Sequence, residues 1–249
     1  MKEPDMKQLH AHLHYLKLPW IKENLEPLAA KAAKEKWTYV RFCAALIEGE
    51  AHQRMDRATQ RRLVAARFPV MKTLESFDWS WPKKINQLEI RDLFRLQFIK
   101  ARENVIFLGG CGMGKSHLAA ALGHEACLKG YRVLFISAAE LINQLLAAQT
   151  EHRLKTEIKK MLRPELLILD ELGYIPLDKH GADLLFQVIS QRYERGSIIL
   201  TSNKAYKDWP EVFNNDSTVT SAILDRLLHH CQTHTITGSS YRMGKKIQE

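Results

Sequence analysis

The chain has 249 residues, of which 45% are hydrophobic and 26% charged, and its 37 Lys and Arg against 28 Asp and Glu give a formal net charge of +9. This composition is typical of a soluble globular protein of one or two domains and excludes a disordered tail or a fibre. No apolar run approaches the ~18 residues of a membrane span, and the charged N-terminus lacks the apolar stretch of a signal peptide, so we expect a cytoplasmic protein without a membrane partner.

Residues 1–104 are predicted to be mainly helical and basic. They hold 20 Lys and Arg against 13 Asp and Glu, a net charge of +7, and contain no glycine from Met1 to Ile47. Phe68-Pro69 should end a basic helix, because proline lacks an amide donor and restricts the residue before it. An irregular aromatic connector at 76–86 then precedes a final helix at about 86–101.

From Asn104 onwards the sequence alternates between strands and helices. Strands are expected at Val105–Leu108, Val133–Ile136, Leu166–Leu169, Ser197–Thr201 and Thr233–Thr237. Helices are expected near 114–129, 138–162 (in two pieces), 180–195 and 219–230. This alternation predicts an α/β fold with a central parallel five-stranded sheet. We expect a small all-α N-terminal domain over 1–75, a connector and linker helix over 76–103, and the α/β domain over 104–249.

The strongest motif follows the first predicted strand. Residues 109–116, GGCGMGKS, match the phosphate-binding loop G-x-x-x-x-G-K-[ST] between a strand and a helix, which argues against a glycine-rich turn that binds nothing. Loop amides would surround phosphate oxygens, Lys115 would reach the β and γ phosphates, and Ser116 would bind Mg²⁺. The candidate cofactor-binding residues are Gly109, Gly110, Cys111, Gly112, Met113, Gly114, Lys115, Ser116 and His117.

Two carboxylates follow the third predicted strand, 55 residues beyond Lys115. Asp170 would hold the hydration shell of the magnesium ion, and Glu171 would polarise a water molecule for attack on the γ phosphate. An Asp-Glu pair after a strand could instead be a solvated turn, but the phosphate-binding loop favours catalysis. A glutamate that activates water also favours hydrolysis over phosphorylation of a small molecule.

Asn203 follows the fourth predicted strand, where a polar side chain can orient the attacking water and sense the γ phosphate. The alternative is an asparagine that caps a helix. A guanine-specific N-K-x-D motif is absent, because Asn203-Lys204 is followed by Ala205 and the aromatic Tyr206. We therefore expect ATP rather than GTP.

Arg226 lies on a predicted helix just before the last strand. Such an arginine could reach the nucleotide of a neighbouring subunit and stabilise charge on the transferring phosphoryl group. A surface salt bridge with Asp225 or Asp216 is an equally good interpretation of the sequence.

Two groups of histidines are candidate metal ligands. Neither has an acidic or cysteine partner at zinc-ligand spacing, so we predict no metal site there. The groups are His10, His12 and His14, and His229, His230, Cys231 and His234.

A row of arginines is the main basic feature of the N-terminal part. Arg54, Arg57 and Arg61 are spaced i, i+3 and i+7, so a helix presents them on one stripe, and Arg62 broadens it. Arginines at this spacing can bridge successive phosphates. A solvated charged face is the alternative, but the charge of +7 favours DNA contact.

Four blocks of sequence together resemble the IstB-type transposition helper ATPases, which are AAA+ proteins similar to the helicase loader DnaC and the initiator DnaA. The blocks are GCGMGKSHLAAALGHEACLKGYRV, LLILDELGYIPLDKHGADLLFQVISQRYERGSIILTSN, AILDRLLHH and SYR. The likeness covers nearly the whole chain, including the connector at Phe77–Trp79. The loop departs from the family at Gly110-Cys111 and Met113, positions that contribute mainly backbone.

The resemblance implies an ATP-controlled factor that oligomerises on double-stranded DNA as a spiral or ring and passes it to the transposase of the same element. It implies these roles: Walker A for Lys115 and Ser116, Walker B for Asp170 and Glu171, sensor I for Asn203, trans-acting finger for Arg226 and sensor II for Arg242. Only 12 residues follow Thr237, so no C-terminal lid is expected. The predicted helical pair at 138–162 resembles an extra helix of the initiator and loader clade and favours a spiral.

Two other functions share parts of this pattern. A DnaC-like replicative helicase loader would use every ATPase motif and differ in its partner. A P-loop kinase would need an acceptor and would ignore DNA, and Glu171 argues against it.

Overall fold

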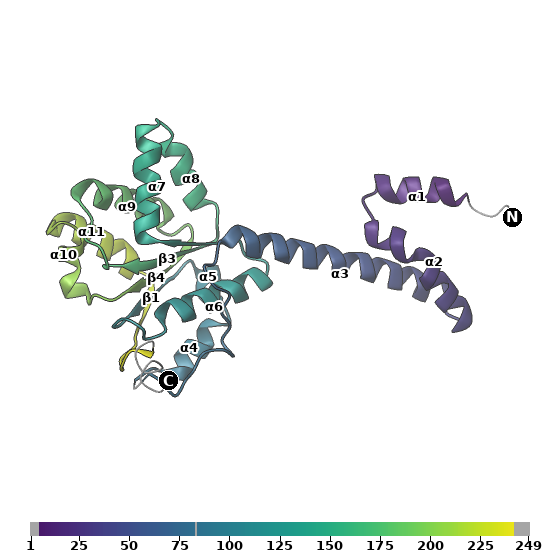
Figure 1. Cartoon of the computed structure of the whole chain (residues 1–249), viewed down its shortest axis with the longest axis horizontal. Helices are drawn as coiled ribbons and strands as arrows, with labels where there is room; N and C mark the ends of the chain where they lie inside the picture. Colours follow the sequence, from purple (N-terminus) through teal and green to yellow (C-terminus); the bar gives the residue numbers. More distant parts are fainter. Residues whose placement is uncertain (1–4, 83, 242–249) are drawn as a thin grey trace. The chain divides into compact units, whose positions relative to one another are not determined.

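The computed structural model describes residues 5–82 and 84–241, and the chain divides into two compact units, 1–61 and 62–249 (Figure 1). This boundary differs from the expected domain end at residue 75, because residues 62–103 belong to the same unit as the sheet. Within the described ranges, no helix combines the length and apolarity needed to cross a membrane.

The N-terminal unit is helical, as predicted. It contains α1 (Met6–Tyr15), α2 (Pro19–Lys34) and the larger part of α3 (Tyr39–Ala66). The ring of Trp20 packs so closely on α3 that a Cβ at Gly49 would lie 2.1 Å from its Cη2 atom. Position 49 therefore admits no side chain without moving α2.

A buried carboxylate joins two of these helices. The Glu50 side chain accepts hydrogen bonds from the backbone amides of Trp20 and Ile21, at 3.0 and 3.3 Å, at the start of α2. These amides have no partner inside their own helix, and no side chain of the residue that precedes the helix caps them. Glu50 therefore supplies from α3 the cap that α2 lacks.

The second unit contains the predicted five-stranded sheet, all parallel, in the order β2-β3-β4-β1-β5. The strands are β1 (Asn104–Leu108), β2 (Val133–Ser137), β3 (Leu166–Leu172), β4 (Ser197–Ser202) and β5 (Cys231–Thr235). The first four are buried along nearly their whole length, because helices cover both faces of the sheet. Of these four, β1, β3 and β4 are central and β2 lies at one edge.

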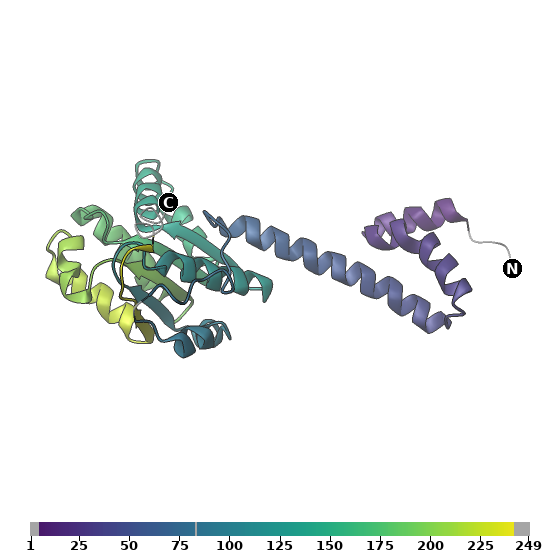
Figure 2. The same cartoon turned by 60° about the horizontal axis from the view of Figure 1, so that its bottom comes forward.

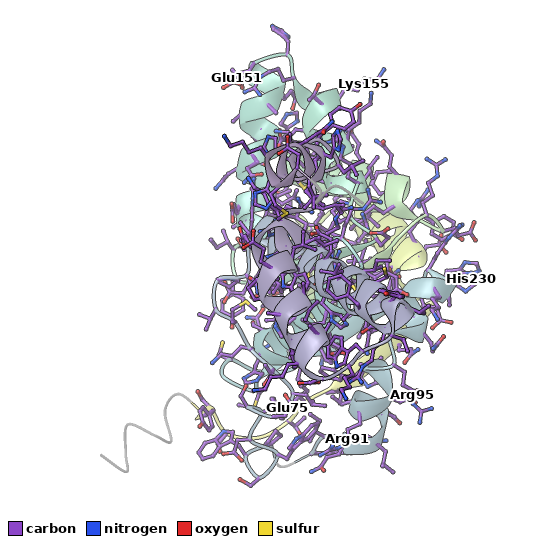
Figure 3. All side chains as sticks on the ribbon, turned by 90° about the vertical axis from the view of Figure 1, so that its right-hand side faces the viewer. Glu75, Arg91, Arg95, Glu151, Lys155 and His230 are labelled. Carbon is purple, nitrogen blue, oxygen red and sulfur yellow. The ribbon has the colours of Figure 1, made fainter. Side chains whose placement is uncertain are left out.

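Helices cover the two faces of the sheet and form two apolar cores with it (Figures 1 and 2). One face packs against α4 (Gln87–Leu93), α5 (Gln97–Ala101) and α6 (Lys115–Leu128). The other packs against α7 (Ala138–Thr150), α8 (Leu154–Leu162), α9 (Lys179–Arg192), α10 (Trp209–Val212) and α11 (Ser217–Leu228). A 3-10 turn, η1 (Tyr206–Asp208), precedes α10. The tip between α7 and α8 carries Glu151 and Lys155 at the surface (Figure 3).

The boundaries of three elements differ from the prediction. The last strand begins at Cys231 rather than Thr233, because Cys231 pairs with Asn104 at the start of β1. The helix expected at 86–101 is two helices, α4 and α5, because Leu96 between them has a left-handed backbone (φ 57°). The third strand continues through Asp170 and Glu171 to Leu172.

A buried arginine fastens the amino-terminal ends of β3 and β4. Arg192, at the end of α9, is 1% exposed, and burial lowers the pKa of its guanidinium to about 10. Its two terminal nitrogens donate to four backbone carbonyls at 2.7 to 3.2 Å, those of Met161, Pro164, Glu165 and Ser197. The charge is thus held by peptide dipoles, without a carboxylate among the described residues.

We predict that Arg192→Met lowers the free energy of unfolding by about 2 to 4 kcal/mol, because it leaves several buried carbonyls without donors. Urea denaturation measures the change. Arg195→Met, at an exposed position three residues later, is the matched control and should stay within about 0.5 kcal/mol of the wild type. Equal effects of both substitutions would contradict this role of Arg192.

Candidate functional site

A cavity of about 890 Å³ opens at the carboxyl edge of the sheet. Strands β1, β3 and β4 end at this edge because they are parallel, and the loops that follow them meet there. The cavity is lined by the loop after β1, by the two carboxylates of β3 and by parts of the segment 67–82. This is the crevice in which open α/β sheets bind ligands.

The loop between β1 and α6 has the backbone of a phosphate-binding loop. Gly112 and Gly114 both have positive φ, 73° and 87°, a conformation that side chains disfavour. A Cβ at Gly114 would also lie 2.6 Å from the ring of Phe77, which belongs to the aromatic connector. The glycine is required both by the turn and by the close approach of Phe77.

Lys115 and Ser116 lie at the start of α6, where the helix exposes unpaired amides. The Lys115 ammonium is buried and donates to the carbonyl oxygens of Gly109 and Gly110, each at 2.7 Å. The Ser116 hydroxyl donates to Asp170 Oδ1 at 2.8 Å. The structure therefore brings the predicted hydroxyl, next to the lysine in the sequence, together with the predicted carboxylate, which lies 54 residues beyond Ser116.

The two carboxylates of β3 differ in their surroundings. Asp170 is buried, whereas Glu171 is exposed and lines the cavity. Asp170 Oδ1 also accepts a hydrogen bond from the hydroxyl of Thr201 at 2.5 Å. Thr201 was not among the expected site residues. Its only signal in the sequence is that it is a hydroxyl residue in an apolar strand, two positions before Asn203.

The connector forms one wall of the cavity and is tied to α6 by His117. The Nε2 atom of His117 lies 3.0 Å from the carbonyl oxygen of Thr73 and 3.2 Å from the Ser76 hydroxyl. Burial lowers the pKa of His117, so the ring is neutral near pH 7. Phe77 packs edge-on against His117, with 5.2 Å between ring centroids.

Two aromatic residues that the sequence analysis did not assign also line this cavity. Trp81 and Tyr241 pack edge-on with ring centroids 5.2 Å apart, and the Tyr241 amide donates to the carbonyl of Gly112. Arg242, the next residue and the predicted sensor II, lies outside the described residues.

Asn203 lies after β4, beside Gly173 of the loop that follows β3. Its Oδ1 atom is buried and has no hydrogen-bond partner among the described residues. The helix-capping alternative is not observed, because the next helical turn, η1, has Ala205 at its N-cap. Asn203 is not among the residues that line the cavity.

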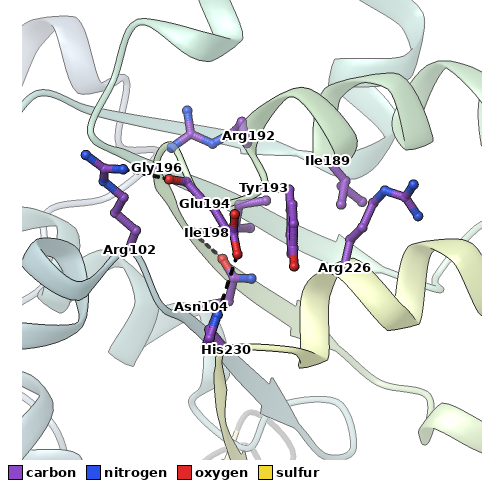
Figure 4. A pocket seen from close by; sticks show the side chains of 10 residues that line it. All are labelled: Arg102, Asn104, Ile189, Arg192, Tyr193, Glu194, Gly196, Ile198, Arg226 and His230. Atoms are coloured by element: carbon purple, nitrogen blue, oxygen red, sulfur yellow. Dashed lines mark hydrogen bonds and ion pairs between the residues drawn. The ribbon is translucent and has the colours of Figure 1, made fainter.

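Arg226 lines a small second pocket between α9 and α11 rather than the cavity at the phosphate-binding loop (Figure 4). Its guanidinium lies 4.8 Å from the ring centroid of Phe186 and donates to the Ala222 carbonyl at 3.0 Å. In the described part of the chain it forms no ion pair, so the expected alternative of a salt bridge with Asp225 or Asp216 is not observed.

The same pocket contains an acidic partner for two histidines that the spacing of the sequence did not reveal. Glu194, after α9, places a carboxylate oxygen within 4.8 Å of ring nitrogens of His229 and His230. Figure 4 shows Glu194 together with His230. All three side chains are exposed, and His230 points outward at the surface (Figure 3). His230 Nε2 and Glu194 Oε1 are 3.8 Å apart, a surface ion pair when the histidine is protonated.

The four candidate arginines for DNA have different environments. Arg54 forms an ion pair with the buried Glu50 at 3.1 Å, and Arg62 donates to the Cys127 carbonyl at 2.9 Å. Arg57 and Arg61 are exposed on α3. Arg57 and Arg61, which hold no buried partner among the described residues as Arg54 does, are four residues apart on α3 and therefore share one face of it.

Comparisons with known proteins agree with this fold. The family model described as IstB-like ATP binding protein matches residues 11–249. The chain is 42% identical over 241 residues to an ATP-binding protein of insertion sequence IS21 from Pseudomonas aeruginosa, covering 97% of this chain and 91% of that one. It is 39% identical over 244 residues to an ATP-binding protein of insertion sequence IS5376 from Geobacillus stearothermophilus, covering 98% and 97%.

Among solved structures, the DnaC helicase loader is similar with a TM-score of 0.54 at 24% identity, over 71% of this chain and 99% of that one. At this identity the likeness shows the fold alone, and it confirms the predicted five-stranded sheet of DnaC-like AAA+ domains. The family match extends over nearly the whole sequence and includes the phosphate-binding loop and the two carboxylates of β3. The chain therefore belongs to the family of IstB-like ATP-binding proteins of insertion sequences.

Proposed function

We propose that this protein is a DNA-binding ATPase that oligomerises on target DNA and assists a transposase in target selection and integration, with ATP hydrolysis resetting or disassembling the oligomer. The observation that carries the proposal is the hydrogen bond between the Ser116 hydroxyl and Asp170 Oδ1, beside Lys115 in the cavity. Hydroxyl and carboxylate oxygens are suited to Mg²⁺, and the adjacent lysine and loop amides are suited to phosphate.

Different residues around the cavity bind different parts of the nucleotide and its metal ion. The amides of the loop and Lys115 bind the phosphates, and Lys115 exchanges its bonds with Gly109 and Gly110 for phosphate oxygens. Ser116 and Asp170 hold Mg²⁺, which when bound neutralises the charge on the phosphates. The connector wall with Phe77 and Trp81 offers aromatic surface for the base.

Glu171 is the residue placed to activate water. It is the exposed carboxylate of the pair, and it lines the cavity next to the proposed Mg²⁺ ligands. As a general base it orients a water molecule and accepts its proton. Asn203, whose amide oxygen is buried without a partner among the described residues, is our candidate for sensing the γ phosphate through the loop at Gly173.

Arg226 supports assembly into a homo-oligomer. It lies in a pocket separate from the cavity of its own chain, so we assign it to the nucleotide of a neighbouring copy. Among the described residues, a cation–π contact and one bond to a backbone carbonyl hold it, and both can be exchanged for a phosphate at modest cost. In this assignment hydrolysis requires contact between subunits, in a spiral or ring.

DNA contact is assigned to the exposed arginines of α3. Arg57 and Arg61 share one face and have the reach to bind successive phosphates. Arg54 and Arg62, in contrast, already hold a buried carboxylate and a carbonyl, so we give them a mainly structural role.

The relatives favour a transposase as the partner. The names of the similar proteins from Pseudomonas aeruginosa and Geobacillus stearothermophilus both refer to insertion sequences. The likeness to the DnaC helicase loader is a likeness of fold at 24% identity. We therefore place the loader function second and propose target DNA and the transposase of the same element as partners.

We predict opposite effects of two substitutions in the cavity. Lys115→Ala should weaken Mg-ATP binding by about 100-fold, because it removes a charged partner of the phosphates. Glu171→Gln should bind ATP normally, abolish turnover, and accumulate as an ATP-bound oligomer on duplex DNA. Titration with a fluorescent ATP analogue and analytical ultracentrifugation with DNA measure these outcomes.

The matched control for the lysine is Lys129→Ala, which removes an exposed ammonium just after the end of α6. It should leave binding and turnover at wild-type values. A Glu171→Gln variant that hydrolyses ATP at the wild-type rate would remove Glu171 from catalysis, and one that stays monomeric with ATP and DNA would contradict the proposed assembly.

A mixing experiment tests Arg226 as a residue that acts between subunits. Arg226→Ala should bind ATP with near-normal affinity as a monomer but hydrolyse it at least ~10-fold more slowly. Mixed with the inactive Lys115→Ala protein, it should regain activity, because one copy supplies the intact loop and the other the arginine. Arg163→Ala, at an exposed site, should hydrolyse normally; failure of the mixture to recover would show that Arg226 acts within its own chain.

We predict that replacing both Arg57 and Arg61 with alanine lowers the slope of log Kd for DNA against log salt by about 2, one unit for each lost phosphate contact. Fluorescence anisotropy over a salt series measures the slope. The control is the double variant Lys7→Ala, Lys22→Ala, which removes two exposed charges of the same unit. It should change the slope less. An unchanged slope in the arginine variant would assign this face of α3 to solvent or protein.

A further inference from the structure

Strand β3 bulges where its two carboxylates lie. Leu169 pairs with Leu200, and Leu172 with Ser202, so three steps along β3 correspond to two along β4. One extra residue on a strand interrupts the ladder and redirects the neighbouring side chains. Asp170 and Glu171 occupy this bulge, opposite Thr201.

The Thr201 hydroxyl bonds to both residues of the bulge. It accepts a hydrogen bond from the backbone amide of Glu171 at 2.9 Å and donates one to Asp170 Oδ1 at 2.5 Å. Thr201 is fully buried, so no solvent can substitute for these bonds. A hydroxyl group can both donate and accept a hydrogen bond, and the Thr201 hydroxyl does both with two adjacent residues of β3.

Glu171 needs such a restraint because its backbone is left-handed, with φ at 64°. A residue with a side chain adopts this conformation only where its surroundings enforce it, and such residues gather at functional sites. The conformation determines in which direction the Cα–Cβ bond leaves the strand. The bond from the Glu171 amide to Thr201 therefore helps to fix the direction of the carboxylate that lines the cavity.

We propose that Thr201 is a positioning residue for ATP hydrolysis: its hydroxyl holds Glu171 in its left-handed conformation and orients the Asp170 carboxylate toward Ser116. This inference rests on the proposed ATPase function. Thr201 does not line the cavity, so it acts only through the two carboxylates. Its β-branched side chain has restricted rotation about χ1, which keeps the hydroxyl in place between them.

The competing explanation is that Thr201 only fills space in the buried strand. The two explanations predict different effects of conservative substitutions at position 201. Thr201→Val keeps shape and volume but loses the hydroxyl, whereas Thr201→Ser keeps the hydroxyl and loses the methyl group. Packing alone predicts that valine is the milder change, and positioning predicts that serine is.

We expect kcat of Thr201→Val to fall by about 10- to 100-fold, since small misplacements of catalytic groups have effects of this size. Affinity for a non-hydrolysable ATP analogue should remain within about 3-fold, because Lys115 and the loop are untouched. Thr201→Ser should recover most of kcat. Thr220→Val is the matched control: Thr220 is also buried, but its hydroxyl bonds to the carbonyl of Asp216 just before α11, and kcat should not change.

A double-mutant cycle tests whether Thr201 acts through Glu171. In single-turnover assays with enzyme in excess, Thr201→Val should lower the residual rate of Glu171→Gln by clearly less than it lowers the wild-type rate, because the base it positions is already absent and only its effect on Asp170 remains. A full additional loss would overturn the proposal, and so would wild-type kcat in Thr201→Val or a valine variant more active than serine.

Two further outcomes are separated by design. If melting curves show that Thr201→Val does not fold, Thr201→Cys takes its place, because it retains a weak S–H donor. The kcat of Thr201→Cys should lie below that of Thr201→Ser, and a wild-type value would refute the inference.

If the wild-type protein does not hydrolyse ATP with DNA present, the proposed function itself fails, and the role of Thr201 fails with it. Hydrolysis by the wild type with an unaffected valine variant refutes the role of Thr201 alone.

Discussion

The site depends on one carboxylate oxygen, Asp170 Oδ1, which accepts hydrogen bonds from the hydroxyls of Ser116 and Thr201. These bonds join three elements at the carboxyl edge of the sheet: α6, which begins there after the phosphate-binding loop, and the strands β3 and β4, which end there. Because Asp170 and Thr201 are buried, the bonds form in a medium of low dielectric, where they are strong and costly to lose. Asp170 therefore links the helix that follows the loop to the strand that carries Glu171 and to the strand that leads to Asn203.

The positive charge of residues 1–104 is shared between the two structural units. Residues 1–104 have a net charge of +7, but the boundary at Arg61 divides it into +3 for residues 1–61 and +4 for residues 62–104. The N-terminal unit therefore has no large excess of positive charge, and the DNA contact that we propose for it depends on a few exposed side chains of α3. The substitutions that test DNA contact are therefore those of Arg57 and Arg61.

The fold and the core of the site could be predicted from the sequence because they depend on local patterns. The phosphate-binding loop is contiguous, and the apolar strands before it and before Asp170 show where the sheet ends. The role of Thr201 could not be predicted, because it arises from a register shift between β3 and β4. The same holds for Glu194, which lies near His229 although it follows α9, far away in the sequence, and for the start of β5, which its pairing with Asn104 determines.

The most direct test of this account is cryo-electron microscopy of the wild-type protein with duplex DNA, Mg²⁺ and a non-hydrolysable ATP analogue. We predict an oligomer on DNA in which the triphosphate contacts Lys115, density for the metal lies between Ser116 and Asp170, and Arg226 of a neighbouring copy approaches the γ phosphate. A nucleotide bound away from the loop after β1, or particles that remain monomeric with both ligands present, would contradict it.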